Sequence, residues 1–223
     1  IRVGDKEEGP DFEDRDAIKI GSNKNDVYNV VIDHVSASWA VDEIISTWSY
    51  EKFIYNVTIM NSIISEGLYK SHHPEGPHSM GMLIGKNSEN ITIKNNIFAY
   101  NRARNPLVRD DSTNIVILNN LIYDVGIPSE NKIAFGTKGI KNIPLKASII
   151  GNVHINQSSQ ENLNTIFIDE KSATKAQIYL SDNIGPLNDN NHSKNQWDLV
   201  YGRDEMKIRV NSSPVWENDF TMI

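Results

Sequence analysis

The sequence contains no cysteine, so disulfide bonds, thiolate nucleophiles and cysteine-ligated zinc sites are all excluded. It has no apolar run near the roughly 20 residues that a membrane-spanning helix needs, so no membrane partner is expected. It also lacks an excess of positive charge, because 22 lysines and arginines stand against 29 aspartates and glutamates, a formal net charge of −7. This balance argues against nucleic acid as the main partner, since phosphate backbones are bound by clustered basic side chains.

A short pattern recurs along the chain. Each copy has apolar residues at its second and fourth places, a period of two that is typical of β-strands with one buried face. A polar step and a second apolar pair follow, as in Ile63-Ile64 and Ile97-Phe98, which predicts a second short strand in the repeat. The copies are separated by 27, 34, 24, 32 and 31 residues and begin at Asn29, Asn56, Asn90, Asn114, Lys146 and Gln177.

Strand-only repeats of this kind predict an all-β parallel β-helix, in which each turn, or rung, pairs its strands with those of the neighbouring rungs. Asn recurs at equivalent corners because it tolerates the left-handed backbone conformation and can bond to its copy in the next rung. The alternative is a β-sandwich, but its strands recur about every 8–12 residues and its hairpin signals are absent. We expect one domain over residues 1–223, with core rungs at about 14–185 and a C-terminal loop and cap at 186–223.

Extra residues between the repeats must leave the solenoid as loops, which often form its binding side. The longest insertion covers residues 65–89, and residues 125–144 are expected to form another loop.

Three charged clusters are candidates for chemistry. Taken singly, each is typical of solvated surface, an exposed turn or surface ion pairs of about 0–1 kcal/mol. In a solenoid, however, equivalent positions stack in space, so the clusters can share one face and set a cation site beside guanidinium groups. Such a site suits a polyanionic substrate. The clusters are the acidic pairs Asp14/Asp16 and Asp42/Glu43 and the basic group Arg102, Arg104 and Arg109.

Five segments resemble motifs of the pectate lyases, a family of right-handed parallel β-helix polysaccharide lyases. The similarity covers roughly residues 10–125, and its motifs occur in the family's order. Residues 29–34 resemble the vWiDH signature, with Val31 in place of the usual Trp, and residues 104–109 match the RxPxxR motif. Residues 14–20 resemble the D-x-D calcium strand, residues 40–44 the second calcium-ligating strand, and residues 83–85 the Leu/Ile-x-Gly strand.

The resemblance implies a Ca²⁺ site. Its ligands would be Asp14, Asp16 and Asp42, with Glu43 as a further carboxylate. Glu43 is included because Ser38 stands where the family usually has another carboxylate, four residues before Asp42.

The resemblance also implies roles for the basic residues. Arg104 would be the base that removes a proton, and Arg109 would be a second catalytic group, holding a substrate carboxylate and stabilising the enolate that develops there. The family's substrate-binding lysine has no direct counterpart, so His78 or Lys70 is expected to replace it, with Arg102 as a further substrate-binding group.

The function implied is a polysaccharide lyase of pectin catabolism. It would cleave an acidic polyuronide such as polygalacturonate by Ca²⁺-assisted β-elimination, and it would be secreted or periplasmic. The chain starts at Ile1 without a signal peptide, and the family's early rungs precede the D-x-D strand. We therefore expect that N-terminal rungs are missing and that a further segment or a partner covers the first rung.

Two other functions and one other metal remain open. A glycoside hydrolase on the same solenoid would use a carboxylate pair, either Asp110/Asp111 or Asp42/Glu43, and a non-catalytic carbohydrate-binding solenoid would only bind. A zinc site is a weaker alternative, because its spacing fits no known motif and Pro74 and Pro77 indicate a loop. Its ligands would be His72, His73 and His78 with Glu66 or Glu75.

Overall fold

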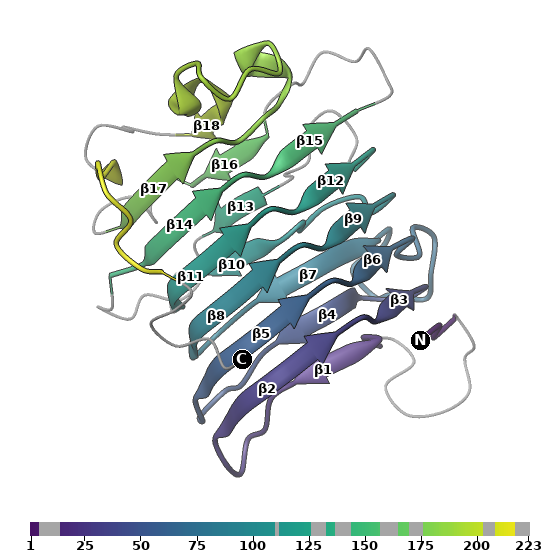
Figure 1. Cartoon of the computed structure of the whole chain (residues 1–223). Helices are drawn as coiled ribbons and strands as arrows, with labels where there is room; N and C mark the ends of the chain where they lie inside the picture. Colours follow the sequence, from purple (N-terminus) through teal and green to yellow (C-terminus); the bar gives the residue numbers. More distant parts are fainter. Residues whose placement is uncertain are drawn as a thin grey trace.

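The computed structural model describes residues 1–4, 14–109, 112–125, 133–136, 144–156, 165–169, 176–202 and 208–216. These residues form a parallel β-solenoid with three sheets, and the chain passes from sheet to sheet as it climbs from one rung to the next (Figure 1). Five successive rungs, from β1–β3 to β13–β15, each contribute one strand to each sheet. The predicted all-β parallel β-helix is confirmed.

The strands stack in register in each sheet. The first sheet has the order β1 (Ile18–Ile20), β4 (Glu43–Thr47), β7 (Met80–Ile84), β10 (Leu107–Arg109), β13 (Ile133–Gly136), β16 (Ile166–Ile168) and β18 (Val200–Gly202). The second sheet has the order β2 (Val27–Asp33), β5 (Ile54–Met60), β8 (Ser88–Lys94), β11 (Thr113–Leu118), β14 (Lys146–Ile150) and β17 (Gln177–Ser181). The third sheet has the order β3 (Ser36–Ser38), β6 (Ile63–Ser65), β9 (Ile97–Ala99), β12 (Leu121–Tyr123) and β15 (Val153–Ile155).

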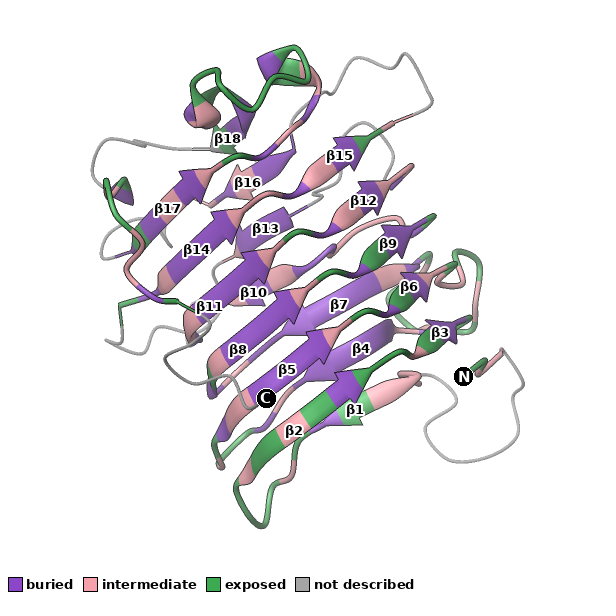
Figure 2. Ribbon diagram, viewed as in Figure 1, coloured by how far each residue is buried: buried purple, intermediate pink, exposed green. Residues whose placement is uncertain are grey.

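The repeated apolar residues form the core. The fourth places of the six sequence repeats pair with one another along the second sheet, and all are buried (Figure 2). Removing apolar surface from water in this way is the main force that favours folding. The column consists of Ile32, Ile59, Ile93, Ile117, Ile149 and Leu180.

Asparagine ladders run along the solenoid, as the repeats predict. The outer ladder consists of the first residues of four repeats, which have φ of 56–57°, and each side-chain amide after the first donates to the side-chain oxygen of the preceding copy over 3.0–3.1 Å. Its members are Asn29, Asn56, Asn90 and Asn114.

A second, buried ladder lies at the corner between the second and third sheets. Each side-chain amide donates to a backbone carbonyl of the rung before it, and the first three also donate to the side-chain oxygen of the next copy over 2.9–3.1 Å. The side-chain oxygens also accept backbone N–H groups, so the buried polar groups of the corner are paired. The inner ladder consists of Asn96, Asn120, Asn152 and Asn183.

The first sheet was harder to foresee from the sequence. The stretch 125–144, expected as a loop, contains β13, and the insertion 65–89 contains β7 and the start of β8. The repeat marks two strands per rung, whereas the strands of the first sheet vary in sequence from rung to rung. The segment 186–223, expected as loop and cap, contributes β18 and the short 3₁₀ helices η2 (Pro186–Asn188) and η3 (Gln196–Leu199). The division of the chain at residue 185 stays a prediction.

The first rung is less completely buried than the second (Figure 2). Residues 1–4 lie beside β3, where Arg2 forms a parallel bridge with Ser38. In the described part of the chain, no helix has the length and apolar character needed to cross a membrane. The inward-facing Ile18, Val27 and Val30 are only partly buried, whereas their paired copies Ile45, Ile54 and Val57 are 0% exposed.

Candidate functional site

A cavity of about 560 Å³ opens over the first sheet. Its walls come from four successive rungs, through β1, β4, β7 and β10 and the segments that flank them. The acidic end of the cavity lies where these strands begin and consists of Asp14, Asp16, Asp42, Glu43, His73, His78 and Arg104. The aromatic end lies where the strands finish and consists of Asn23, Trp48, Tyr50 and Arg109.

The register of the solenoid brings the acidic residues together. Asp16 precedes β1 and Glu43 begins β4, and the backbone N–H of Glu43 donates to Asp16 Oδ1 over 3.1 Å. Residues separated by 27 positions in the sequence thus become neighbours, because one rung separates them. Ser46 adds a hydroxyl that donates to the other oxygen of Asp16.

Three carboxylates converge at the acidic end. One oxygen each from Asp14, Asp16 and Asp42 lies within 4.8 Å of the others. Burial raises the pKa of Asp16 to about 6, and burial together with neighbouring Asp42 raises that of Asp14 to about 6. Grouped carboxylate oxygens of this kind are the donors that hard cations such as Ca²⁺ prefer, and a cation offsets their mutual repulsion. The structure therefore brings together three of the four predicted metal ligands, and their donor chemistry fits Ca²⁺.

Glu43, the fourth predicted ligand, lies at the same end of the cavity, but its carboxylate faces Arg104. Its carboxylate is 2% exposed, and its Oε1 accepts a hydrogen bond from Nη1 of Arg104. It is not a member of the three-carboxylate group. A buried carboxylate needs a partner charge, and the arginine of a later rung supplies it.

Arg104 lines the cavity beside the carboxylates. Its Nη1 lies 4.0 Å from Asp42 Oδ1. Burial lowers the pKa of Arg104 and the charge of Arg109 lowers it further, whereas Asp42 and Asp16 act in the opposite direction. Arg109 reaches the cavity from the end of β10, where its guanidinium lies over the ring of Trp48, 5.2 Å from the centroid.

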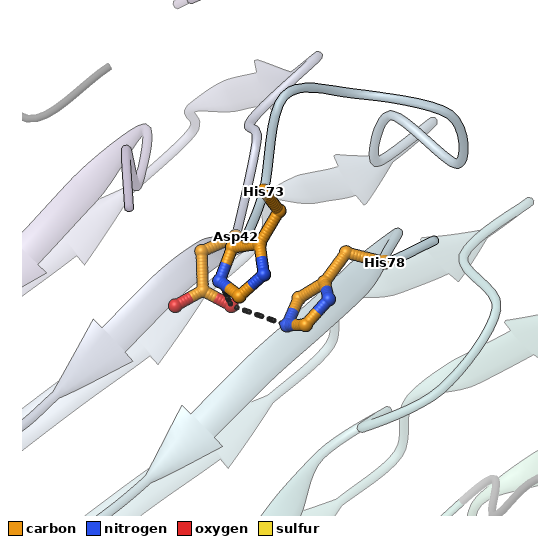
Figure 3. Close-up of side chains that lie close together, drawn as sticks. All are labelled: Asp42, His73 and His78. Carbon is orange, nitrogen blue, oxygen red and sulfur yellow. Dashed lines mark ion pairs between the residues drawn. The ribbon is translucent and has the colours of Figure 1, made fainter. Parts of the chain in front are cut away.

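Two histidines of the 65–89 insertion face Asp42 (Figure 3). Nε2 of His78 lies 3.1 Å from Asp42 Oδ1, Nε2 of His73 lies 3.8 Å from it, and the two rings stack with centroids 3.5 Å apart. Burial alone would raise the pKa of Asp42, but hydrogen bonds with His78 and Asp14 and the charge of Arg104 outweigh it and lower that pKa. Burial alone would lower the pKa of His78, but the hydrogen bond with Asp42 and the charge of Asp42 outweigh it and raise that pKa.

The chain was compared with curated proteins and with family models. It is 35% identical over 141 residues to the probable pectate lyase C of Aspergillus flavus and to that of Aspergillus oryzae, a match that covers 63% of this chain and 28% of each relative. It is 36% identical over 107 residues to the probable pectate lyase C of Aspergillus terreus, covering 47% of this chain and 22% of the relative. The chain thus resembles the pectate lyases. No family model matches it.

These matches confirm the resemblance stated from the motifs. They also set its extent, because the match with the first two relatives takes in only 28% of their length. The activity of the whole protein is therefore a matter for proposal.

Two predicted substrate-binding residues do not line the cavity. Lys70 is exposed, and Arg102 donates to the carbonyl of Pro77 over 3.2 Å and lies over the ring of Tyr69. Ser38 is buried in β3 of the third sheet and also lies outside the cavity wall. Asp110 and Asp111, which the hydrolase alternative uses, lie outside the described residues.

The geometry also bears on the zinc alternative. His73 and His78 come together, but they meet on Asp42 and not on Glu66 or Glu75. The backbone N–H of Glu75 donates to Nδ1 of His73 over 3.1 Å, which puts the proton of a neutral imidazole on Nε2. Metal-ligating histidines have the opposite arrangement, donating from the ring nitrogen that does not bind the metal.

Sequence reasoning missed the aromatic end of the cavity. Trp48 and Tyr50 directly follow β4, and their rings meet edge to face with centroids 6.0 Å apart. The available signal was the placement of two aromatic residues just after an apolar strand, at positions with no copy in the other repeats.

Proposed function

We propose that this chain belongs to a pectate lyase-like polysaccharide lyase that cleaves an acidic polyuronide, of the polygalacturonate type, by β-elimination. The observation that carries the proposal is the convergence of three carboxylates and two guanidinium groups from different rungs in one cavity. The similarity to proteins named probable pectate lyase C supports the same function.

The reaction sets two requirements. The proton on C5 of a uronate lies next to a carboxylate, and it is removed only if the charge that develops on that carboxylate is offset. Asp14, Asp16 and Asp42 would hold a Ca²⁺ ion, and that ion, when bound, supplies positive charge to the substrate carboxylate. Arg109 lies at the other end of the same cavity and would contact a substrate carboxylate from there.

Arg104 is the proposed base. An ordinary arginine is always protonated, so this role requires a lowered pKa, and burial of Arg104 acts in that direction. Glu43 and Asp42 orient the guanidinium toward the cavity. The base takes the C5 proton, the electron pair forms the C4–C5 double bond, and the C4–O bond breaks while the leaving oxygen takes up a proton.

Three further proposals concern the cationic group that binds the substrate, the segment that covers the first rung and the location of the protein. Of the two candidates for the cationic substrate-binding group, His78 lines the cavity and Lys70 does not. The partly exposed inward side chains of the first rung support a covering segment or partner at that end. A polymer substrate of this kind would be met outside the cytoplasm, so we also propose a secreted or periplasmic location.

The test is incubation with polygalacturonate and Ca²⁺, with near-ultraviolet absorbance recording the unsaturated product. We expect turnover that a chelator abolishes and a rate that rises with pH above neutrality, because only neutral Arg104 accepts a proton. Arg104→Ala should lower the rate by about 10²–10⁴-fold. Lys146→Ala, which removes a cation of β14 outside the cavity wall, should not change it.

Two results would replace the proposal with its alternatives. Reducing ends without unsaturated product would indicate a glycoside hydrolase. Polymer binding without any turnover would indicate a carbohydrate-binding solenoid.

A further inference from the structure

We propose that Trp48, Tyr50 and Lys86 form a separate uronate-binding subsite, which holds a second unit of the acidic polymer away from the reacting one. This inference rests on the proposed function, because it names a further substrate contact in the same cavity. It concerns the aromatic end of the cavity, where the strands of the first sheet end, and it involves neither the three converging carboxylates nor Arg104.

The two ends of the cavity are far enough apart for more than one sugar. Asp42 and Trp48 flank β4, so their Cα atoms are separated by six residue steps of extended chain, which span about 20 Å. The whole cavity, at about 560 Å³, has the size of sites that enclose ligands larger than a single small ring. A polymer unit bound at the carboxylates thus leaves room for another unit toward Trp48 and Tyr50.

The aromatic end has the surface that a sugar ring requires. Tyr50 is 62% exposed and forms part of the cavity wall, so much of its side chain is accessible to a ligand. A pyranose ring has an apolar C–H face, and packing it on an aromatic ring removes apolar surface of both from water. Trp48 meets Tyr50 edge to face and continues this wall inward.

Cationic groups accompany the aromatic rings. Lys86 lies beside the cavity wall, with its Nζ 5.7 Å from the centroid of Tyr50, and the guanidinium of Arg109, which is part of the wall, lies 5.2 Å from the centroid of Trp48. A site for neutral sugars does not need these charges. An aromatic face flanked by an ammonium and a guanidinium matches a sugar that carries a carboxylate.

The pair is also held in place before any ligand binds. Gly85 directly follows β7, and a Cβ at this position would lie 2.2 Å from Cε3 of Trp48. The absence of a side chain at Gly85 therefore lets the indole pack directly on the backbone there. The backbone N–H of Trp48 donates to the carbonyl of Ile20 over 3.0 Å, and that of Tyr50 donates to Asn23 Oδ1 over 3.2 Å. A rigid platform loses little entropy on binding.

The experiment measures binding separately from turnover. In an Arg104→Ala background with Ca²⁺ present, retardation in native gels that contain polygalacturonate gives the dissociation constant. Tyr50→Ala should weaken binding about tenfold, whereas Tyr50→Phe, which keeps the ring, should bind like the parent. The matched control is Tyr28→Ala, which removes a tyrosine of similar exposure, 54%, from β2 of the second sheet and should leave binding unchanged.

The charge is tested with Lys86→Gln. This variant should bind unesterified polygalacturonate several-fold more weakly and fully methyl-esterified polymer no differently from the parent, because only the free carboxylate contacts the ammonium. In the chain that keeps Arg104 and is therefore able to turn over substrate, Tyr50→Ala should raise KM for the long polymer about tenfold and leave kcat within about twofold.

The outcomes separate this proposal from the proposed function. Unchanged binding in Tyr50→Ala, or an equal loss in Tyr28→Ala, overturns the subsite even if the wild type is an active lyase. Tyr50-dependent binding by a chain that forms no unsaturated product keeps the subsite and overturns the lyase.

Discussion

Two regions of this solenoid follow opposite rules. At the corner between the second and third sheets, four successive rungs carry the same side chain, and Asn96, Asn120, Asn152 and Asn183 bond to one another. On the first sheet, the paired positions of β1, β4, β7 and β10 change from a charged to a polar to an apolar side chain along the rungs: Lys19, Ser46, Leu83 and Leu107.

The difference reflects two physical tasks. A ladder of identical amides pairs the buried backbone groups of its corner, so the loss of one amide leaves polar groups without their partner. A binding site instead needs unlike groups close together, such as carboxylates beside guanidinium groups. The cavity accordingly lies on the sheet whose sequence varies.

The largest effect on stability is expected from a substitution that breaks the inner ladder. Asn120→Ala removes an acceptor for the N–H of Asn96 and a donor to the carbonyl of Ile93, both in the buried corner. We expect a loss of about 2–4 kcal/mol in the free energy of unfolding, because at least two buried groups lose their partner. Denaturant titration followed by circular dichroism measures it.

The control is the preceding residue of the chain. Asn119 is exposed, with a φ of 53°, so Asn119→Gly keeps the backbone conformation that the position requires. This variant should stay within about 0.5 kcal/mol of the parent. Equal losses for Asn119→Gly and Asn120→Ala would show that the inner ladder has no special role.

The next effect concerns the first sheet, whose sequence varies, and the carboxylates proposed to bind Ca²⁺ there. Asp16→Asn should weaken Ca²⁺ binding about a hundredfold, because it removes one of three converging charges. Glu43→Gln should weaken it less than about tenfold, since Glu43 pairs with Arg104. Isothermal titration with Ca²⁺ gives both constants.

A double variant separates the effect of the charge of Glu43 on Ca²⁺ binding from a direct contact between Glu43 and the ion. Glu43→Gln with Arg104→Gln deletes both members of the ion pair, so the net charge near the carboxylates stays the same. It should bind Ca²⁺ nearly as well as the parent. Complete loss of Ca²⁺ binding in this double variant would mean that Glu43 is a ligand after all.

The smallest effect lies where the repeat itself is interrupted. Gly151 has a φ of 66°, and a Cβ there would lie 2.3 Å from the side-chain oxygen of Asn119 on the rung before. Gly151→Ala should cost about 1 kcal/mol in thermal or chemical unfolding, because it combines left-handed strain with a shift of Asn119. Gly151→Asn should cost less, since asparagine tolerates this conformation; a larger cost for Asn than for Ala would contradict this account.

Much of the second and third sheets was predictable from the sequence. Their apolar pairs and asparagines recur, and repetition makes a weak local signal readable by comparing copies. The strand β13 was not predictable, because its residues, Ile133–Gly136, have no recognisable copy in the other rungs. Its partner is β10, and only the stacking of rungs brings the two together.

The candidate site was predictable in its charged members and not in their pairing. Asp14, Asp16, Asp42, Arg104 and Arg109 all line the cavity, as the motifs indicate. The ion pair that occupies Glu43 depends on a contact across 61 positions of sequence.

The exclusion of Lys70 and Arg102 from the cavity depends on the path of the 65–89 insertion. Pattern and spacing contain neither piece of information.

The amino-acid order alone determined that the chain would stack strands into a solenoid, because period-two apolar residues and corner asparagines state the local geometry of every rung. Which charges would meet, and which aromatic rings would stand beside them, was decided by the tertiary structure. Those contacts depend on how side chains of different rungs pack and neutralise one another, and such interactions act through space between residues that the sequence keeps far apart.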